Sequence, residues 1–235
     1  MTGVRSLGRV KAAWSLALGV LCIAAISGAR AASILEQGSY YGLGFGQSKY
    51  DQSKSELDND VLSAIEPGLS AQNFSSQLDN SDTTYDALVG YRFGAHLAVE
   101  GAYADLGAAA YTASMTLTDT KTTAPQTNST HFSSKGFMVS ALGIVPFGSR
   151  WEAYGRGGLI YADTELRVTR VRAGFPTTRD DSSQSSDWVF GVGAGCELGD
   201  HFSIRVEYQK FKNVGDSNTG ETDVDTIDLR VLYRL

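Results

Sequence analysis

The chain has few of the residue types that usually carry catalytic or metal-binding chemistry. Of its 235 residues, only two are cysteine and three are histidine. Cys22 falls in an N-terminal apolar segment, so only Cys196 is left in the rest of the chain, which excludes an internal disulfide there. No Cys/His cluster has metal-site spacing, and no glycine-rich loop opens a helix to hold a phosphate. We therefore expect neither a metal nor a cofactor.

Long apolar runs are also scarce. The clearest is "AAWSLALGVLCIAAI" at 12–26, which follows three basic residues and precedes Ala29 and Ala31 in an A-x-A arrangement. This order predicts a secretory signal peptide over residues 1–31, cleaved after Ala31, because the run is short for a membrane anchor. Residues 32–235 would then form the exported protein.

Basic residues are outnumbered. The chain has 20 Lys and Arg against 26 Asp and Glu, a net charge of −6. The predicted signal peptide contains basic residues and no acidic ones, so the exported part is more acidic still. Because it also lacks a basic stripe, we expect no nucleic-acid partner.

The exported part instead contains eight strand-like segments with a two-residue hydrophobic period. Most approach the roughly nine to eleven residues that a tilted strand needs to cross a bilayer. The segments are 39–47, 84–93, 97–106, 136–145, 151–162, 188–198, 202–211 and 225–235. Short connections (94–96, 146–150, 199–201) alternate with long polar ones (48–83, 107–135, 163–187, 212–224), and the first long one has a weak helical period at "DNDVLSAIE".

This alternation predicts an all-β fold, a membrane-spanning, eight-stranded, antiparallel up-and-down β-barrel. Short periplasmic turns and long extracellular loops are typical of such barrels. The two faces of each segment favour this fold over a soluble β-sandwich. In the seventh segment, Phe202, Ile204 and Val206 share one face, and Arg205 and Glu207 share the other.

The polar faces are also rich in glycine, which weakens a strand but suits a narrow barrel interior. Examples are Gly42, Gly44, Gly46, Gly191, Gly193 and Gly195. We therefore expect the apolar set to face lipid and the small and charged residues to fill the lumen. Aromatic residues near both ends of the segments would form the interfacial girdles.

Three stretches resemble the eight-stranded transmembrane domain of the outer-membrane protein A family. They are "VGYRFGAHLAVEGAYADLG" (89–107), "SALGIVPFGSRWEAYGRGGL" (140–159) and "GVGAGCELGDHFSIRVEYQKFKNVGD" (191–216). The resemblance covers essentially all of residues 32–235. It implies a Gram-negative outer membrane, surrounding lipid and lipopolysaccharide, and assembly by the barrel-assembly machinery. A peptidoglycan-binding domain follows the barrel in that family, and we expect none after this one.

The resemblance further implies that four charged residues, Glu100, Arg156, Glu197 and Arg205, pair inside the barrel, and the strand faces place these four inward. An unpaired buried charge is costly, so pairing is expected. Ala141 stands where the family has an inward lysine, so Glu197 would find Arg156 or water instead. The expected interior residues are Arg92, Glu100, Arg156, Glu197, Arg205 and Glu207.

The last segment, "TIDLRVLYRL" (226–235), is expected to pair with 39–47 and close the barrel. Its apolar stripe would face lipid, and the resemblance implies that the assembly machinery reads it. Leu235 stands where the family usually ends in Phe. The stripe consists of Ile227, Leu229, Val231, Tyr233 and Leu235.

Three functions remain open from the sequence. The leading one is a structural, cell-envelope barrel whose loops contact partners outside the cell, through adhesion or host contact, with no ligand indicated. The second is a small-conductance pore through the charged interior. The third is a lipid A-modifying enzyme, for which His131 and Ser133 in "THFSSK" are the residues to test, since His96 and His201 fall in short turns. We expect no catalytic residues.

Overall fold

A computed structural model describes residues 37–216 and 219–235, so the predicted signal peptide lies outside the described residues. Among the described residues, no helix is long and apolar enough to cross a membrane. In chain order, the elements are β1 (Gly38–Tyr50), α1 (Lys54–Ser63), β2 (Ser70–Asp79), β3 (Ser81–Arg92), β4 (Leu97–Thr118), β5 (Thr123–Phe147), β6 (Trp151–Arg172), β7 (Phe175–Glu197), β8 (Phe202–Asp216) and β9 (Gly220–Arg234).

Eight of the nine described strands close into a ring of antiparallel pairs. The order around it is β1, β3, β4, β5, β6, β7, β8 and β9, and β9 pairs back onto β1. At this seam, Leu43 lies opposite both Ala87 of β3 and Val231 of β9. The Leu235 amide also donates to the Ser39 carbonyl oxygen at 3.1 Å. The predicted eight-stranded up-and-down barrel is confirmed, and each predicted segment contributes to one strand of the ring.

Side chains alternate around the ring in the sense expected for a membrane barrel. Large apolar side chains point outward, with exposed fractions of 69% for Leu43, 67% for Phe137 and 64% for Val139. Charged side chains point inward, and Glu100 and Arg230 are buried. A soluble barrel would place the apolar set inside, so this outer surface is suited to hydrocarbon rather than water.

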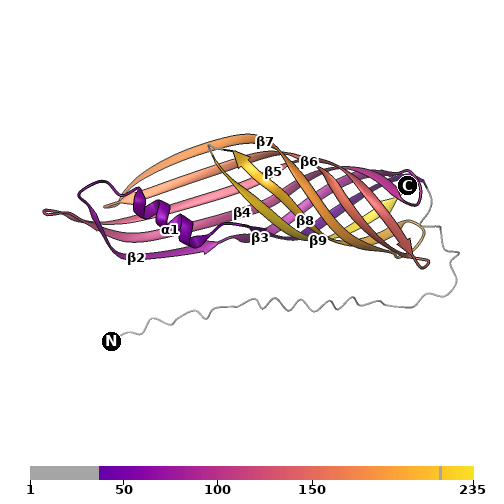
Figure 1. The fold of residues 1–235 in the computed structure, drawn as a ribbon, viewed down its shortest axis with the longest axis horizontal. Helices are drawn as coiled ribbons and strands as arrows, with labels where there is room; N and C mark the ends of the chain where they lie inside the picture. The colour runs from indigo at the N-terminus through magenta and orange to yellow at the C-terminus, as the bar shows by residue number, and fades with distance from the viewer. Residues whose placement is uncertain (1–36, 217–218) are drawn as a thin grey trace, which may run out of the picture. The chain divides into compact units, whose positions relative to one another are not determined.

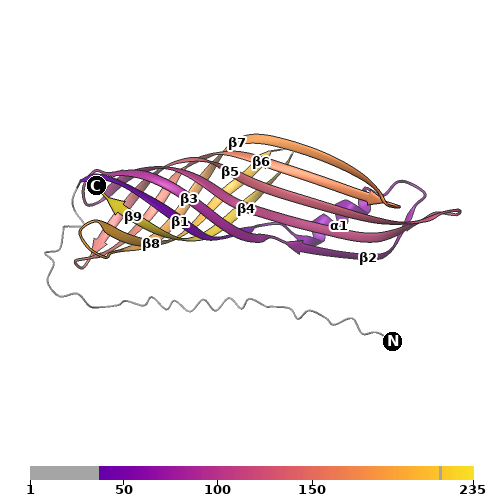
Figure 2. The same ribbon diagram turned by 180° about the vertical axis from the view of Figure 1, so that it is seen from behind.

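Four strands continue past one end of the ring (Figures 1 and 2). β4, β5, β6 and β7 have 22, 25, 22 and 23 residues, whereas β8 and β9 have 15 each. Beside β4, the pairing with β3 stops at Tyr85–Asp105, and β2 takes over from Ala110 to Thr118. We call the distal parts of β4–β7, together with β2 and α1, the extension. It lies at the end of the ring opposite the C-terminus.

The extension differs from the long loops predicted for this end. The connections 107–135 and 163–187 are mostly strand, and the hairpins turn only at 119–122 and 173–174. The connection 48–83 contains α1 and β2. Distal β4 has a buried apolar stripe of Tyr111, Ala113, Met115 and Leu117, whereas the residues between them are Ser and Thr and the outer face therefore lacks the apolar side chains that mark the ring. The Thr, Tyr and Val residues of these strands still favour extended backbone.

A β-bulge marks the level at which β4 leaves the ring. The register shifts between Asp105 and Ala108, and Gly107 has a φ of +72°. Glycine adopts this backbone conformation without a steric penalty. The Asp82 carboxylate of β3 accepts a hydrogen bond from the Ala108 amide at 2.9 Å, which holds the bulge at the end of the β3–β4 pairing.

Candidate functional site

Arg156 of β6 lies at the centre of the ring and contacts three other strands. Its Nε donates to Glu207 Oε1 of β8 at 2.5 Å, and its Nη2 donates to Glu100 Oε2 of β4 at 2.6 Å. Its Nη1 donates to Ser140 Oγ of β5 at 2.5 Å. The side chains of Arg156, Glu100 and Glu207 have no exposed surface. The guanidinium therefore has carboxylate and hydroxyl partners in place of water, as a buried charge requires.

Further ion pairs extend this contact toward the short turns. Arg205 donates from Nη1 to Glu100 Oε1 at 2.7 Å and lies 3.0 Å from Glu152 Oε1 through Nη2. Arg92 then donates to Glu152 Oε2 at 2.7 Å. Arg92 also donates to the carbonyl oxygens of Gly94 and Ala95, both at 2.9 Å, so the series ends on the β3–β4 turn.

In the other direction, the series ends on β3. Arg230 of β9 contacts Glu207 through Nη1 and lies 2.9 Å from Asp86 Oδ2 through Nη2. Cations and anions therefore alternate without interruption across the ring, and we call this set the interior charge chain. Its members, in order of contact, are Arg92, Glu152, Arg205, Glu100, Arg156, Glu207, Arg230 and Asp86.

Two tyrosines fill the space around the interior charge chain. Tyr40 donates to Glu100 Oε1 at 2.6 Å and Tyr154 donates to Glu207 Oε2 at 3.0 Å. The Arg205 guanidinium carbon lies 5.3 and 5.0 Å from the two ring centroids, a cation–π arrangement. A Cβ on Gly193 would collide with the Tyr154 ring, which explains the glycine on the inner face of β7.

Five of the six predicted interior residues belong to the interior charge chain, and Glu197 does not. Glu197 ends β7 near the short turns, where it accepts a hydrogen bond from Arg234 Nη2 at 3.0 Å rather than from Arg156. Its position at the end of β7 separates it along the barrel from Arg156, in the middle of the membrane-spanning part of β6. Sequence reasoning missed Asp86, Glu152, Arg230, Tyr40 and Tyr154, although the two-residue period put Glu152 on the face of Arg156.

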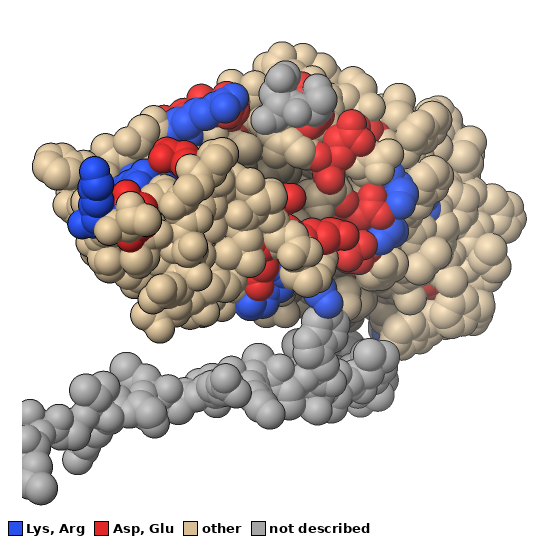
Figure 3. All heavy atoms as spheres, turned by 60° about the vertical axis from the view of Figure 1, so that its left-hand side comes forward, with Lys and Arg blue, Asp and Glu red and all other residues tan. Residues whose placement is uncertain are grey.

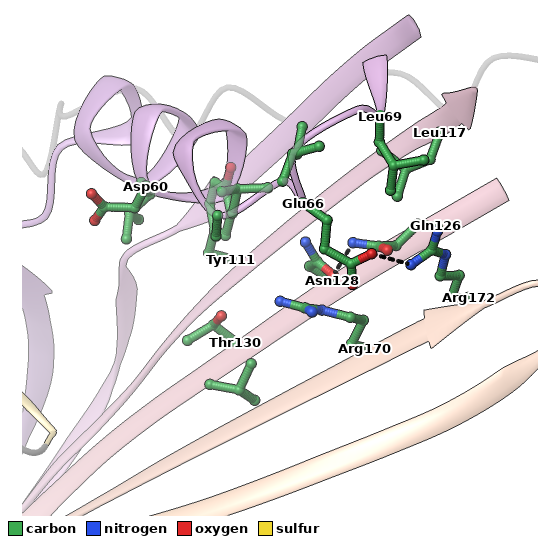
Figure 4. A pocket seen from close by; sticks show the side chains of 15 residues that line it. Asp60, Glu66, Leu69, Tyr111, Leu117, Gln126, Asn128, Thr130, Arg170 and Arg172 are labelled. Carbon is green, nitrogen blue, oxygen red and sulfur yellow. Dashed lines mark hydrogen bonds and ion pairs between the residues drawn. The ribbon is translucent and has the colours of Figure 1, made fainter. Parts of the chain in front are cut away.

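The extension holds a second candidate site. α1 lies over an open cavity of about 210 Å³ that is also lined by β4, β5 and β6 (Figure 4). The helix is fixed at its first turns, where Lys54 Nζ donates to Ser76 Oγ of β2 at 2.5 Å and to Asp58 Oδ2 at 2.8 Å. Tyr111 of β4 donates to Asp58 Oδ1 at 2.6 Å. The second half of α1 lies over the cavity.

The contacts of Asp58 alter its acidity. Hydrogen bonds from Lys54 and Tyr111 stabilise its ionised form and lower the pKa of the carboxyl to about 2. Burial and the hydrogen bond to Asp58 raise the pKa of Tyr111 to about 12. The ionised carboxylate and the neutral phenol therefore hold α1 on β4 over the whole physiological pH range.

Figure 3 shows Lys and Arg side chains beside Asp and Glu side chains on one face of the molecule. Exposed ion pairs include Arg167 with Asp180 at 2.6 Å and Arg179 with Asp181 at 2.7 Å. Across residues 37–216 and 219–235, no group of three or more His, Cys, Asp or Glu side chains could hold a metal ion.

The closed ring, the lipid-facing apolar surface and the charged interior define an integral outer-membrane β-barrel protein. A family model for the outer membrane protein beta-barrel domain matches residues 18–234, and the chain belongs to this family. The protein is therefore located in a Gram-negative-type outer membrane, in contact with lipid and lipopolysaccharide. No curated protein sequence matches the chain.

Similar solved structures include Ail, the attachment invasion locus protein of Yersinia pestis, with 15% identity and a TM-score of 0.45 over 86% of this chain and 100% of that one. Neisserial surface protein A has 14% identity and a TM-score of 0.46 over 84% and 97%. The N-terminal β-barrel domain of OprF from Pseudomonas aeruginosa has 12% identity and a TM-score of 0.42 over 85% and 100%.

Proposed function

We propose that this outer-membrane barrel is a non-conducting envelope protein that presents its extension to partners outside the cell. The observation that carries the proposal is the interior charge chain, which crosses the lumen with its charges paired. An eight-stranded barrel has room for side chains alone, whereas open aqueous channels need about sixteen strands. Removing one partner of a buried pair typically costs about 3–5 kcal/mol, so thermal motion rarely opens such a lumen.

Planar-bilayer recording tests the closed lumen. We expect no steady current from the wild-type protein, because every ion path would have to break a contact of Arg156. Glu207→Ala should introduce current bursts, and Asp180→Asn, an exposed change on the extension, should not. A small-conductance pore is the second candidate, favoured by the polar lumen. A steady wild-type current that falls in Glu100→Gln would establish the pore and overturn the closed barrel.

The role of the extension is tested by shortening it. Ala110 faces His131 and Arg167 faces Asp180 in the ladders. Replacing residues 111–130 and 168–179 each by an Asn-Gly turn would keep both hairpins in register. Cells carrying the shortened barrel should attach less to host surfaces than cells with the full chain at equal surface levels. Equal attachment would reject a role of the extension in adhesion.

We also propose that the protein is not an enzyme. His131 and Ser133 both lie on the outward face of β5, opposite Arg167 and Glu165 of β6. A nucleophile needs a base in hydrogen-bond reach and a third group that orients that base. Among the described residues, His131 has no hydrogen bond that would orient its ring. His131→Ala should leave the lipid A mass profile unchanged, and a loss of one lipid A species would overturn this.

Export and assembly complete the proposal. We propose that residues 1–31 are removed on export and that residues 32–235 form the barrel. The assembly machinery would recognise an apolar stripe formed by outward-facing residues of β9 together with Leu235, which follows the strand. The stripe consists of Ile227, Leu229, Val231, Tyr233 and Leu235.

A further inference from the structure

We propose that the cavity under α1 binds a small amphipathic anion, with one carboxylate, sulfonate or phosphate group on a compact apolar body. The cavity lies in the extension, so the proposal depends on the extension standing outside the membrane. It does not depend on a closed lumen or on adhesion. Figure 4 shows polar and basic side chains gathered at one part of the cavity, beside Glu66.

The anion-binding end is built around Arg170 of β6. Arg170 is an exposed residue that lines the cavity, and it has no ion pair or hydrogen bond with any residue in 37–216 or 219–235. Arg172, two residues on and on the same face, is held by Glu66 at 3.5 Å. This pair is largely exposed, at 38% and 67%, so it contributes little and can be exchanged for a ligand anion.

Two amides of β5 complete this end. Gln126 Nε2 donates to Asn128 Oδ1 at 3.1 Å, and both side chains are buried. This contact uses the acceptor of Asn128 and leaves its amide nitrogen without a partner among the described side chains. A guanidinium and an amide donor that face one cavity can bind an anion together, and charge-assisted hydrogen bonds are the strong ones.

Asp60 is the other acidic residue of the lining, and it does not neutralise Arg170. In Figure 4, its carboxylate points away from the amides and the two arginines. Glu66 is already paired with Arg172. The uncompensated charge at the polar end of the cavity is therefore positive, although the protein as a whole is acidic.

The apolar wall comes from α1. Leu57, Val61 and Ile65 recur every four residues, so they lie on one face of the helix and its C-terminal continuation, and all three line the cavity half-buried. Leu117 of β4 and Val168 of β6 face them from the sheet. A small hydrated ion would leave these apolar side chains in contact with water, so we expect the ligand to have an apolar body as well as a charge.

The volume sets the size of the ligand. A dry cavity of roughly 150 Å³ holds one benzene ring, and drug-sized ligands occupy roughly 300–1,000 Å³. The volume of about 210 Å³ lies between these values and suits one or two fused rings or a short acyl chain whose anionic group reaches the open side.

The test uses the full-length barrel in nanodiscs, with 2-naphthoate as the anionic probe and the isosteric 2-naphthamide as its neutral control. Calorimetry should detect naphthoate binding to the wild type, and naphthamide should bind at least about tenfold more weakly. Arg170→Gln should remove this preference by weakening naphthoate about tenfold without changing naphthamide. The matched control Arg179→Gln, an exposed arginine of the extension outside the cavity lining, should bind like the wild type.

Val168→Trp, which fills the cavity and keeps Arg170, should abolish binding of both probes. Each variant should keep the gel shift between unheated and boiled samples, because none of the changes touches the ring. Equal binding of the two probes by the wild type, or unchanged naphthoate binding in Arg170→Gln, would overturn the proposal. Conductance and cell attachment are separate readouts, so failure here leaves the proposed function standing.

Discussion

Arg156 and Glu207 face each other from β6 and β8 across Gly191 of the strand between them. Nε and Oε1 are 2.5 Å apart, and a Cβ on Gly191 would lie 2.8 Å from Glu207 Oε1. The missing side chain therefore gives Glu207 room to reach Arg156. The same carboxylate also contacts Arg230 of β9 and accepts the Tyr154 hydroxyl at 3.0 Å. Three strands of the ring thus depend on one carboxylate.

Neutralising this carboxylate should therefore be costly. Glu207→Gln keeps the shape but leaves Arg156 and Arg230 each with one fewer counter-charge in a buried site. We expect a loss of about 3–5 kcal/mol in the free energy of unfolding. The measurement is the urea midpoint of the gel shift in detergent micelles.

Asp180→Asn is the matched control for Glu207→Gln. It breaks an ion pair of similar length, Arg167 with Asp180, whose side chains are 64% and 60% exposed. Such surface pairs contribute about 0–1 kcal/mol. Equal midpoints for the two variants would show that the interior charge chain does not stabilise the barrel.

Glycine on the inner face of β7 should also be necessary for stability. Gly193→Val forces a side chain against the Tyr154 ring and the Val206 carbonyl. Overpacking typically costs about 1–3 kcal/mol, so the urea midpoint should fall. Gly157→Val is the control, because Gly157 faces outward on β6 and has nothing within 4 Å of an added Cβ. A control that is destabilised as much as Gly193→Val would point to strand propensity rather than to the interior.

Acid pH should weaken the docking of α1 onto β4. The pKa of Asp58 is lowered to about 2 from the 3.8 expected of an exposed aspartate. A depressed carboxyl pKa adds stability above the unfolded value and loses it as the pH falls through the folded value. α1 should therefore become accessible to pepsin as the pH falls from about 4 to 2. Because the activity of pepsin itself changes with pH, the rate is compared with that of Asp58→Asn: the wild type should be cleaved more slowly than this variant at about pH 4 and at a similar rate at about pH 2, and a constant ratio of the two rates would refute the docking role.

The last residue offers a test of the assembly signal. Leu235→Ser should lower the amount of heat-shifted barrel in the outer membrane, and Leu235→Phe should match or exceed the wild type. Refolding of purified chains into detergent separates recognition from stability. If Leu235→Ser refolds as well as the wild type but accumulates less in cells, the machinery reads this position. Equal accumulation of all three chains would refute the assembly signal.

Sequence patterns predicted the ring because a bilayer imposes a strict alternation on every strand. Leu43, Phe137 and Val139 are on the outside because lipid requires it, and that requirement is visible in the letters. The inward direction of Glu100 and Arg156 follows from the same period. The period does not indicate which charged residues contact each other, since contact across the lumen depends on how far neighbouring strands are shifted along one another. Glu197 illustrates this, because the expected partner was Arg156 or water and the partner in the structure is Arg234.

The extension was not predictable in the same way. Beyond the bilayer, the outer face no longer has to be apolar, so the Ser- and Thr-rich stretches of β2 and distal β4–β7 appeared to be polar loops, although Tyr111, Ala113, Met115 and Leu117 alternate on β4. The role of Arg170 was not predictable either, because nothing in its neighbours along the chain indicates that it lines a cavity together with α1, more than a hundred residues earlier. These features depend on contacts between distant segments.

The seam between β1 and β9 has a consequence for biosynthesis. The first strand of the ring is synthesised well before its second neighbour, and Tyr41 stays without its partner Tyr233 until β9 arrives. Until then, both β1 and β8 present open edges that a bilayer cannot hydrate. The barrel can therefore close only after β9 has been synthesised and exported, so translation and export must precede the completion of folding. A chain interrupted before β9 keeps its edges open, which exposes it to envelope proteases as a substrate for quality control.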